Sequence, residues 1–205
     1  MRCHRATPAL GRWSRRHSLV AVLRSPFRAA RSGFPLLAVL ALATVALPAC
    51  APRPTVRLPV LAVGDSVMEF AAPLLRAQGM TVDAQQSRQF KEAIPIVQSD
   101  AARGLLPSIV IVHLGTNGPI TPTICDALVA AVGHRRLILM NLSMHGQRSW
   151  EQTNDVVIAQ CAARHHLQLI DWKAASNGQP WFAADQIHLD AAGTRAYATI
   201  VRRSL

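Results

Sequence analysis

The sequence predicts an α/β protein, a three-layer α/β/α sandwich with a mainly parallel five-stranded sheet. Apolar runs without alternating polar residues indicate strands that are buried on both faces, as in parallel sheets. Stretches with helical spacing separate these runs, and such regular alternation of strand and helix favours a sheet covered by helices on both sides. The alternation extends from Leu58 to Leu205 and contains no internal repeat.

Five segments carry the strand signal. The clearest is SIVIVHLG at 108–115, because its β-branched residues favour extended backbone. The first, LPVLAVG, is a continuous apolar run that ends in Gly64. The strands are expected at 58–64, 80–84, 108–115, 135–143 and 167–172.

Five segments with helical spacing follow these strands. The helix expected at 121–133 has Thr121 as a capping residue, proline in its first position and Gly133 at its end. Pro73 lies inside the first helical segment and is expected to interrupt or kink it. The helices are expected at 67–78, 91–104, 121–133, 149–165 and 189–204.

Ligands of such sheets bind at the carboxyl ends of the strands, and Ser66 lies directly after the first strand. It also begins a helix, whose N-terminal N–H groups can stabilise a developing oxyanion. Taken alone, the segment GDSV favours a simple helix cap by Asp65 or Ser66 over a nucleophile. Met68 stands where the G-x-S-x-G motif has its second glycine, which argues against a conventional α/β-hydrolase.

A base and an orienting carboxylate lie near the last expected helix. Asp185 and His188 are three residues apart, so a turn can bring the carboxylate to imidazole Nδ1 and leave Nε2 for Ser66. Asn117, after the strongest strand, offers an amide donor for a tetrahedral oxyanion. Each short segment has an ordinary alternative, a loop pair or a turn. Their joint occurrence at strand ends favours catalysis.

The segments GDSV, GTN and DQIH resemble, in this order, three sequence blocks of the SGNH (GDSL-type) hydrolase superfamily. With HLDAAGTRAYA, the chain is similar to the extracellular SGNH domain of acyltransferase-3-type O-acetyltransferases of cell-surface polysaccharide and peptidoglycan. The resemblance implies the flavodoxin-like SGNH hydrolase fold. It also implies a serine esterase or acyltransferase that acts on O-acetyl esters of cell-envelope carbohydrate through an acyl-serine, with no metal and no organic cofactor.

By position, the resemblance makes Ser66 the nucleophile, His188 the general base and Asp185 its orienting partner. The oxyanion hole would consist of the backbone N–H groups of Ser66 and Ser87 and the side chain of Asn117. The superfamily normally has glycine where this chain has Ser87. Because a positive φ costs serine more than glycine, the geometry at Ser87 is the main departure from the pattern.

Two more residues are candidate substrate contacts. Arg88 could touch the substrate, although a solvated surface arginine is the ordinary alternative. Trp181 could stack on a sugar, although a core or rim tryptophan is the alternative. His145, after the fourth expected strand, is a rival base, and His113, within a strand, is expected to be a core or rim histidine.

The charge and hydropathy pattern of residues 1–50 predicts an export signal or an N-terminal membrane anchor. Eight arginines and no acidic residue precede position 32, and the apolar run that follows is shorter than the about 20 residues that span a membrane. The run ends at Cys50, a candidate lipidation site. Residues 51–57 are expected to form a Pro-rich linker and 58–205 the SGNH hydrolase-like domain. The domain is therefore expected to be periplasmic or extracellular.

The charge distribution and the resemblance together indicate which kinds of partner to expect. The formal net charge is +11, but from Cys50 onward 14 basic residues face 11 acidic ones, and no aromatic-interleaved basic patch appears, so no nucleic acid is expected. The expected partners are an acylated carbohydrate or small ester, the membrane through the N-terminus, and a separate membrane acyltransferase that supplies acyl groups. The alternative is a catalytically inactive envelope-binding lipoprotein with the same fold.

Cysteine usage leaves one question open. Cys125 and Cys161 fall in two expected helices, and an exported domain permits a disulfide between them. Two buried thiols are the equally acceptable alternative, because the sequence does not give the distance between the Cα atoms.

Overall fold

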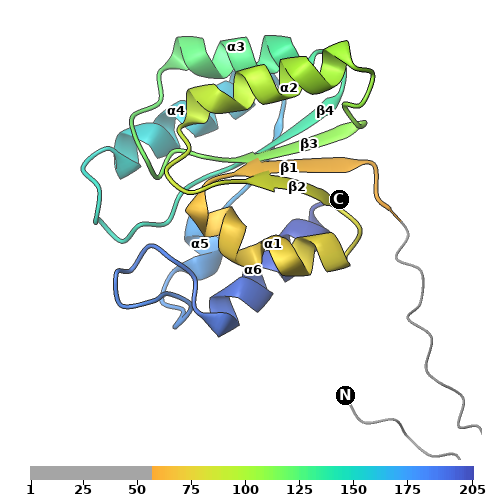
Figure 1. Ribbon diagram of the computed structural model, residues 1–205. Coiled ribbons are helices and arrows are strands. Elements are labelled where there is room, and N and C mark those ends of the chain that lie inside the picture. Colours follow the sequence, from red (N-terminus) through yellow and green to blue (C-terminus); the bar gives the residue numbers. More distant parts are fainter. Residues whose placement is uncertain (1–56) are drawn as a thin grey trace, which may run out of the picture. The chain divides into compact units, whose positions relative to one another are not determined.

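The computed structural model describes residues 57–205 (Figure 1). All five strands are parallel and form one sheet, in the order β2-β1-β3-β4-β5. The strands are β1 (Val60–Gly64), β2 (Thr81–Ala84), β3 (Ile109–His113), β4 (Arg136–Met140) and β5 (Gln168–Ile170). The register pairs Gly64 with His113 at the carboxyl ends of β1 and β3.

Helices cover both faces of this sheet (Figure 1). One layer contains α2 (Ala93–Ala102), α3 (Pro122–Val132) and α4 (Glu151–Arg164). The other contains α1 (Ser66–Ala77), α5 (Trp172–Ser176) and α6 (Ala191–Arg203), and α1 packs beside α6. The predicted fold class, a three-layer sandwich around a parallel sheet, is confirmed.

The turn from β1 to α1 explains the Gly-Asp-Ser sequence. A Cβ at Gly64 would lie 2.4 Å from the Cβ of Met68, so only glycine lets the first turn of α1 approach the end of the strand. Asp65 then caps the helix, with its Oδ1 accepting the N–H of Val67 at 3.0 Å. Ser66 consequently occupies the first position of the helix.

Three expectations about local structure need correction. The strand expected at 167–172 ends at Ile170, because Asp171 accepts the N–H of Ala174 and begins the unexpected helix α5. The helix α1 runs through Pro73, which lies on its exposed side. A one-turn 3-10 helix, η1 (Phe90–Glu92), also precedes α2 within the region expected to be one helix.

The structure pairs Cys125 of α3 with Cys161 of α4 in a disulfide, with their Cα atoms 6.4 Å apart. Both residues are completely buried. The bridge therefore joins two helices of the layer that does not contain α1.

The predicted leader, the linker residues 51–56 and the lipidation site Cys50 lie outside the described residues. Within residues 57–205, no helix has the length and the apolar character needed to cross a membrane.

Candidate active site

Ser66, His188 and Asp185 form a hydrogen-bonded chain. The distance from Ser66 Oγ to His188 Nε2 is 2.9 Å, and that from His188 Nδ1 to Asp185 Oδ2 is 2.5 Å. With Nδ1–H donated to the carboxylate, Nε2 is left unprotonated and can accept the serine proton. The structure thus brings together all three residues predicted as nucleophile, base and orienting group.

The loop before α6 holds the carboxylate in place. Asp185 Oδ1 accepts the N–H groups of Ile187 and His188, each at 3.0 Å. The hydrogen bond from the imidazole, followed by the two N–H donors, lowers the pKa of Asp185 to about 2. An anionic Asp185 is therefore available at neutral pH to stabilise an imidazolium that forms during proton transfer.

Predicted oxyanion donors come from the loops after β2 and β3. Ser87 is exposed and has a φ of 61°, so it adopts the left-handed conformation that glycine reaches most easily. The Asn117 side chain lies beside this segment and donates to the carbonyl oxygen of Arg88 at 3.3 Å. Serine therefore accommodates the predicted backbone conformation at a modest cost, since the strain of a non-glycine residue there is about 1 kcal/mol.

Arg88 has a structural role in the described residues, and its predicted substrate contact stays a prediction. Its side chain is buried, and Nη1 donates to the carbonyl oxygens of Gly64 and Asp83. Nη2 forms an ion pair with the Asp83 carboxylate at 2.7 Å. Because these partners occupy the guanidinium, Arg88 joins the ends of β1 and β2 next to the candidate oxyanion hole.

The ring of Trp181 is partly buried and stacks on the buried ring of Trp172 at a centroid distance of 5.8 Å. A Cβ at Gly193 would lie 2.0 Å from the Trp181 carbonyl oxygen, so this loop packs closely on the start of α6. The predicted sugar contact of Trp181 stays a prediction, and the geometry gives the residue a packing role.

The rival base, His145, is exposed and packs edge-on against Phe182, while His188 is the histidine on Ser66. His113 is a core histidine, as expected. It is buried, and its Nδ1 lies 2.8 Å from the hydroxyl of Tyr197.

Burial perturbs two groups next to the nucleophile. Asp65 is inaccessible to solvent, and burial raises its pKa to about 6 against the lowering effects of Thr116 and the Val67 N–H. Burial also lowers the pKa of His113 to about 4. Each group is therefore disfavoured in its charged form.

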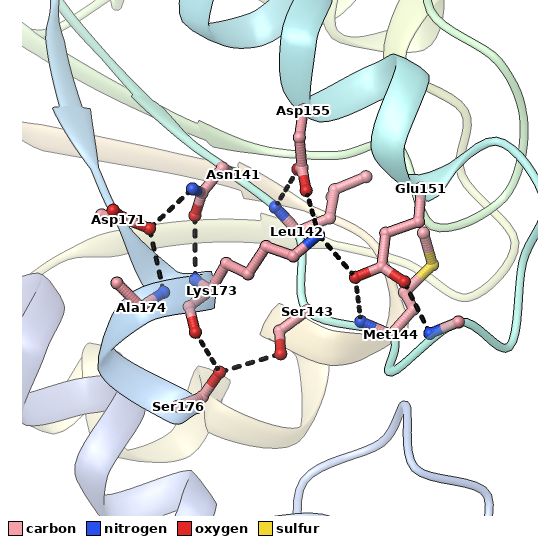
Figure 2. Close-up of polar contacts among 11 residues, drawn as sticks. Asn141, Leu142, Ser143, Met144, Glu151, Asp155, Asp171, Lys173, Ala174 and Ser176 are labelled. Carbon is pink, nitrogen blue, oxygen red and sulfur yellow. Dashed lines mark hydrogen bonds and ion pairs between the residues drawn. The ribbon is translucent and has the colours of Figure 1, made fainter. Parts of the chain in front are cut away.

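A polar network fixes the loop after β4, and sequence reasoning missed it (Figure 2). The ammonium of Lys173 lies 2.8 Å from Asp155 and 3.3 Å from Glu151. These carboxylates in turn accept backbone hydrogen bonds from the loop. Asp155 accepts the N–H of Leu142, and Glu151 accepts the N–H groups of Met144 and Gly146. Residues 142–146 are thereby tied to α4 and α5.

The fixed loop bears on the candidate active site through His145, whose ring packs against Phe182. Phe182 forms a β-bridge with Leu189, directly after His188. Two surface cavities, of about 640 and 520 Å³, flank the Lys173 network, and neither is lined by Ser66 or His188. The network thus fixes the residues on both sides of His145, Met144 and Gly146.

One group of side chains within residues 57–205 has the spacing of metal ligands, namely Asp126, Cys161 and His165. The Cys161 sulfur belongs to the disulfide, and Asp126 is paired with Arg164 and His165. The donor set therefore does not suit a metal ion, because its only soft ligand is already bonded.

A curated relative matches the chain in sequence, although no protein-family model matches it. The chain is 33% identical over 144 residues to the peptidoglycan O-acetyltransferase OatA of Listeria monocytogenes, an alignment that covers 69% of this chain and 23% of that protein. The chain thus spans about a quarter of the length of this relative. The predicted resemblance to these O-acetyltransferases is confirmed for the matched part.

Solved structures share the fold. The C-terminal catalytic domain of peptidoglycan O-acetyltransferase A from Streptococcus pneumoniae has a TM-score of 0.61 at 22% identity, covering 73% of this chain and 93% of that one. A GDSL-like lipase from Bacteroides thetaiotaomicron has a TM-score of 0.56 at 14% identity, covering 71% of this chain and 86% of that one. Such low identities show the common fold alone.

Proposed function

We propose that this chain, a member of the SGNH (GDSL-type) hydrolase superfamily, is an exported serine esterase or O-acetyltransferase acting on O-acetyl esters of cell-envelope carbohydrate. The observation that carries the proposal is the hydrogen-bonded chain from Ser66 through His188 to Asp185. Helix capping alone would not require an imidazole on the serine hydroxyl. The carbohydrate substrate is proposed from the relative in Listeria monocytogenes, which is named for acetyl transfer to peptidoglycan.

In the first half-reaction, His188 Nε2 takes the proton of Ser66 as Oγ attacks the ester carbonyl carbon. The carbonyl oxygen becomes an oxyanion, which the N–H groups of Ser66 and Ser87 and the Asn117 amide stabilise. Asp185 stabilises the imidazolium. The ester C–O bond then breaks, His188 returns the proton to the departing oxygen, and an acyl-serine remains.

In the second half-reaction, His188 takes a proton from an acceptor hydroxyl, whose oxygen attacks the acyl-serine. The second tetrahedral intermediate collapses, Ser66 recovers its proton from His188, and the new ester or acid leaves. With water as acceptor the chain is an esterase, and with a sugar hydroxyl it is a transferase. The same three side chains serve both reactions, so the acceptor distinguishes them.

Export and partners are part of the proposal. The basic stretch and apolar run before Cys50 support delivery to the cell envelope, with anchoring by lipid at Cys50 or by an uncleaved N-terminal helix. The disulfide between Cys125 and Cys161 supports an oxidising compartment. A separate membrane acyltransferase would supply acetyl groups for the transferase reaction.

The test is hydrolysis of 4-nitrophenyl acetate by the purified protein and by its Ser66→Ala and His188→Ala variants. We expect each variant to lose turnover by several orders of magnitude while keeping the circular dichroism spectrum of the wild type. Turnover retained in either variant would refute the assignment. A folded wild type without turnover on this ester or on O-acetylated peptidoglycan would favour the alternative, a non-catalytic envelope-binding lipoprotein.

A further inference from the structure

Phe70 is a large apolar side chain left exposed beside Ser66 and His188. It lies on α1, one helical turn after Ser66, and 48% of its surface is exposed. The centroid of its ring lies 5.3 Å from that of the His188 imidazole, with the two planes inclined at 39°. The ring therefore covers part of the imidazole and presents the rest of its surface to solvent.

The fold does not need this ring in its core. The buried contacts of α1 come from Val67, Met68, Ala71, Ala72 and Leu75, whereas Phe70 and its neighbour Glu69 are exposed. Within residues 57–205, the other large exposed apolar side chains are Leu105 after α2 and Val156 on α4, in the opposite layer. A single exposed apolar side chain is ordinary on a protein surface, so what distinguishes Phe70 from Leu105 and Val156 is its position against the imidazole of His188.

The geometry of acyl transfer tells which part of the substrate Phe70 would meet. In the proposed reaction, the acyl oxygen faces the N–H groups of Ser66 and Ser87 and the Asn117 amide. The alcohol oxygen lies at His188 Nε2 instead, since the imidazole returns the serine proton to that oxygen. Phe70 packs on the imidazole, so it lies on the alcohol side of the ester.

We propose that Phe70 is a substrate-binding residue that packs against the apolar C–H face of the sugar ring that carries or accepts the acetyl group. This inference rests on the proposed function and specifies its substrate class. A single exposed ring matches the flat face of a pyranose, whereas a long acyl chain needs a continuous apolar channel. The exposed carboxylate of Glu69, next along α1, suits the hydroxyl groups at the edge of a sugar.

Binding is tested first without turnover. Soluble O-acetylated peptidoglycan fragments are titrated calorimetrically into Ser66→Ala protein, alone and combined with Phe70→Ala, Phe70→Trp or Val156→Ala. Val156 is the matched control because its side chain is also 48% exposed but lies on α4. We expect Phe70→Ala to raise Kd roughly tenfold, the order of one aromatic stacking contact. Phe70→Trp should keep the affinity within about twofold, and Val156→Ala should not change it.

Turnover then separates sugar binding from an effect on His188. With Ser66 restored, we expect Phe70→Ala to lower kcat/KM for the fragments roughly tenfold relative to kcat/KM for ethyl acetate, whose alcohol part is too small to stack on an aromatic ring. The loss should arise mainly through KM. An equal loss on both substrates would mean that the ring only positions His188 and would overturn the inference. An unchanged Kd, or no fragment binding, would also overturn it.

These failures differ from failure of the proposed function, in which Ser66→Ala keeps its ester turnover.

Discussion

Asp65 and His113 should act on folding stability in opposite directions across the same pH range. Both side chains are buried, and β1 and β3 place them near each other beside Ser66. Burial raises the pKa of Asp65 from 3.8 to about 6 and lowers the pKa of His113 from 6.5 to about 4. Each pKa thus differs by roughly two units from its value in the unfolded chain, which corresponds to about 3 kcal/mol per group.

The sign of each contribution follows from which state binds the proton more tightly. The folded state holds the Asp65 proton more tightly than the unfolded chain, so its contribution to stability is present below pH 3.8 and is lost as pH rises through about 6. The folded state holds the His113 proton less tightly, so its contribution is present above pH 6.5 and is lost as pH falls through about 4. In the wild type these two contributions nearly cancel.

The variant Asp65→Asn should reveal the pH dependence of folding stability that His113 contributes. Asparagine caps a helix as well as aspartate does, so the cap on Val67 is kept while the titrating acid is removed. The contribution of His113 is then unopposed, and we expect the free energy of unfolding to rise by about 3 kcal/mol between pH 4 and pH 6.5 relative to the wild type. Urea unfolding followed by circular dichroism at several pH values measures this difference.

Asp190→Asn is the matched control, because Asp190 caps α6 through the N–H of Gly193 in the same way but is only partly buried. It should keep the pH profile of the wild type. If Asp65→Asn also keeps that profile, the reasoning about opposed buried charges is wrong.

Three further predictions concern other features. Ser87→Gly relieves the φ of 61° and should retain ester turnover while changing stability by no more than about 1 kcal/mol in urea unfolding; lost turnover would argue against a backbone donor there. Glu151→Gln weakens the buried network and should cost about 1–3 kcal/mol in thermal unfolding, whereas exposed Glu69→Gln should cost nothing measurable. Reduction of the disulfide between Cys125 and Cys161, which are 36 residues apart, should lower the free energy of unfolding by about 3 kcal/mol. Turnover at 25 °C should stay intact, because α3 and α4 lie across the sheet from α1, which begins with Ser66. Inactivation by a mild reductant would contradict this.

The layers and the hydrogen-bonded chain of Ser66, His188 and Asp185 could be predicted because their signals are local. A buried parallel strand is a short apolar run, and Asp185 and His188 carry their relation in a spacing of three residues. The position of Ser66 at the start of a helix could be predicted from its two neighbours in the sequence, Gly64 in the turn and Asp65 as the cap. The motifs GDSV, GTN and DQIH each lie after or near the end of a strand, and a parallel sheet brings such ends to the same edge.

The network around Lys173 could not be predicted because its members have no common pattern. Glu151, Asp155 and Lys173 lie on two helices, and only packing at the edge of the sheet brings them within 3.3 Å. The structural contacts of Arg88 could not be predicted for a similar reason, since no sequence pattern shows that carbonyl groups of β1 and β2 lie within reach of its guanidinium. The helix α5 was missed because Trp172 continues the apolar pattern of β5.

The order of the candidate catalytic residues along the chain has a consequence for the synthesis of the protein. Ser66 precedes His188 by 122 positions, and α1 packs against α6, so the first and last helices of the domain meet at the site. A ribosome or an export channel that delivers the chain from its N-terminus therefore releases the nucleophile long before its base. A partly delivered chain holds an ordinary serine, because the hydrogen-bonded chain from Ser66 to Asp185 can form only after residue 188 has been released and the domain has folded.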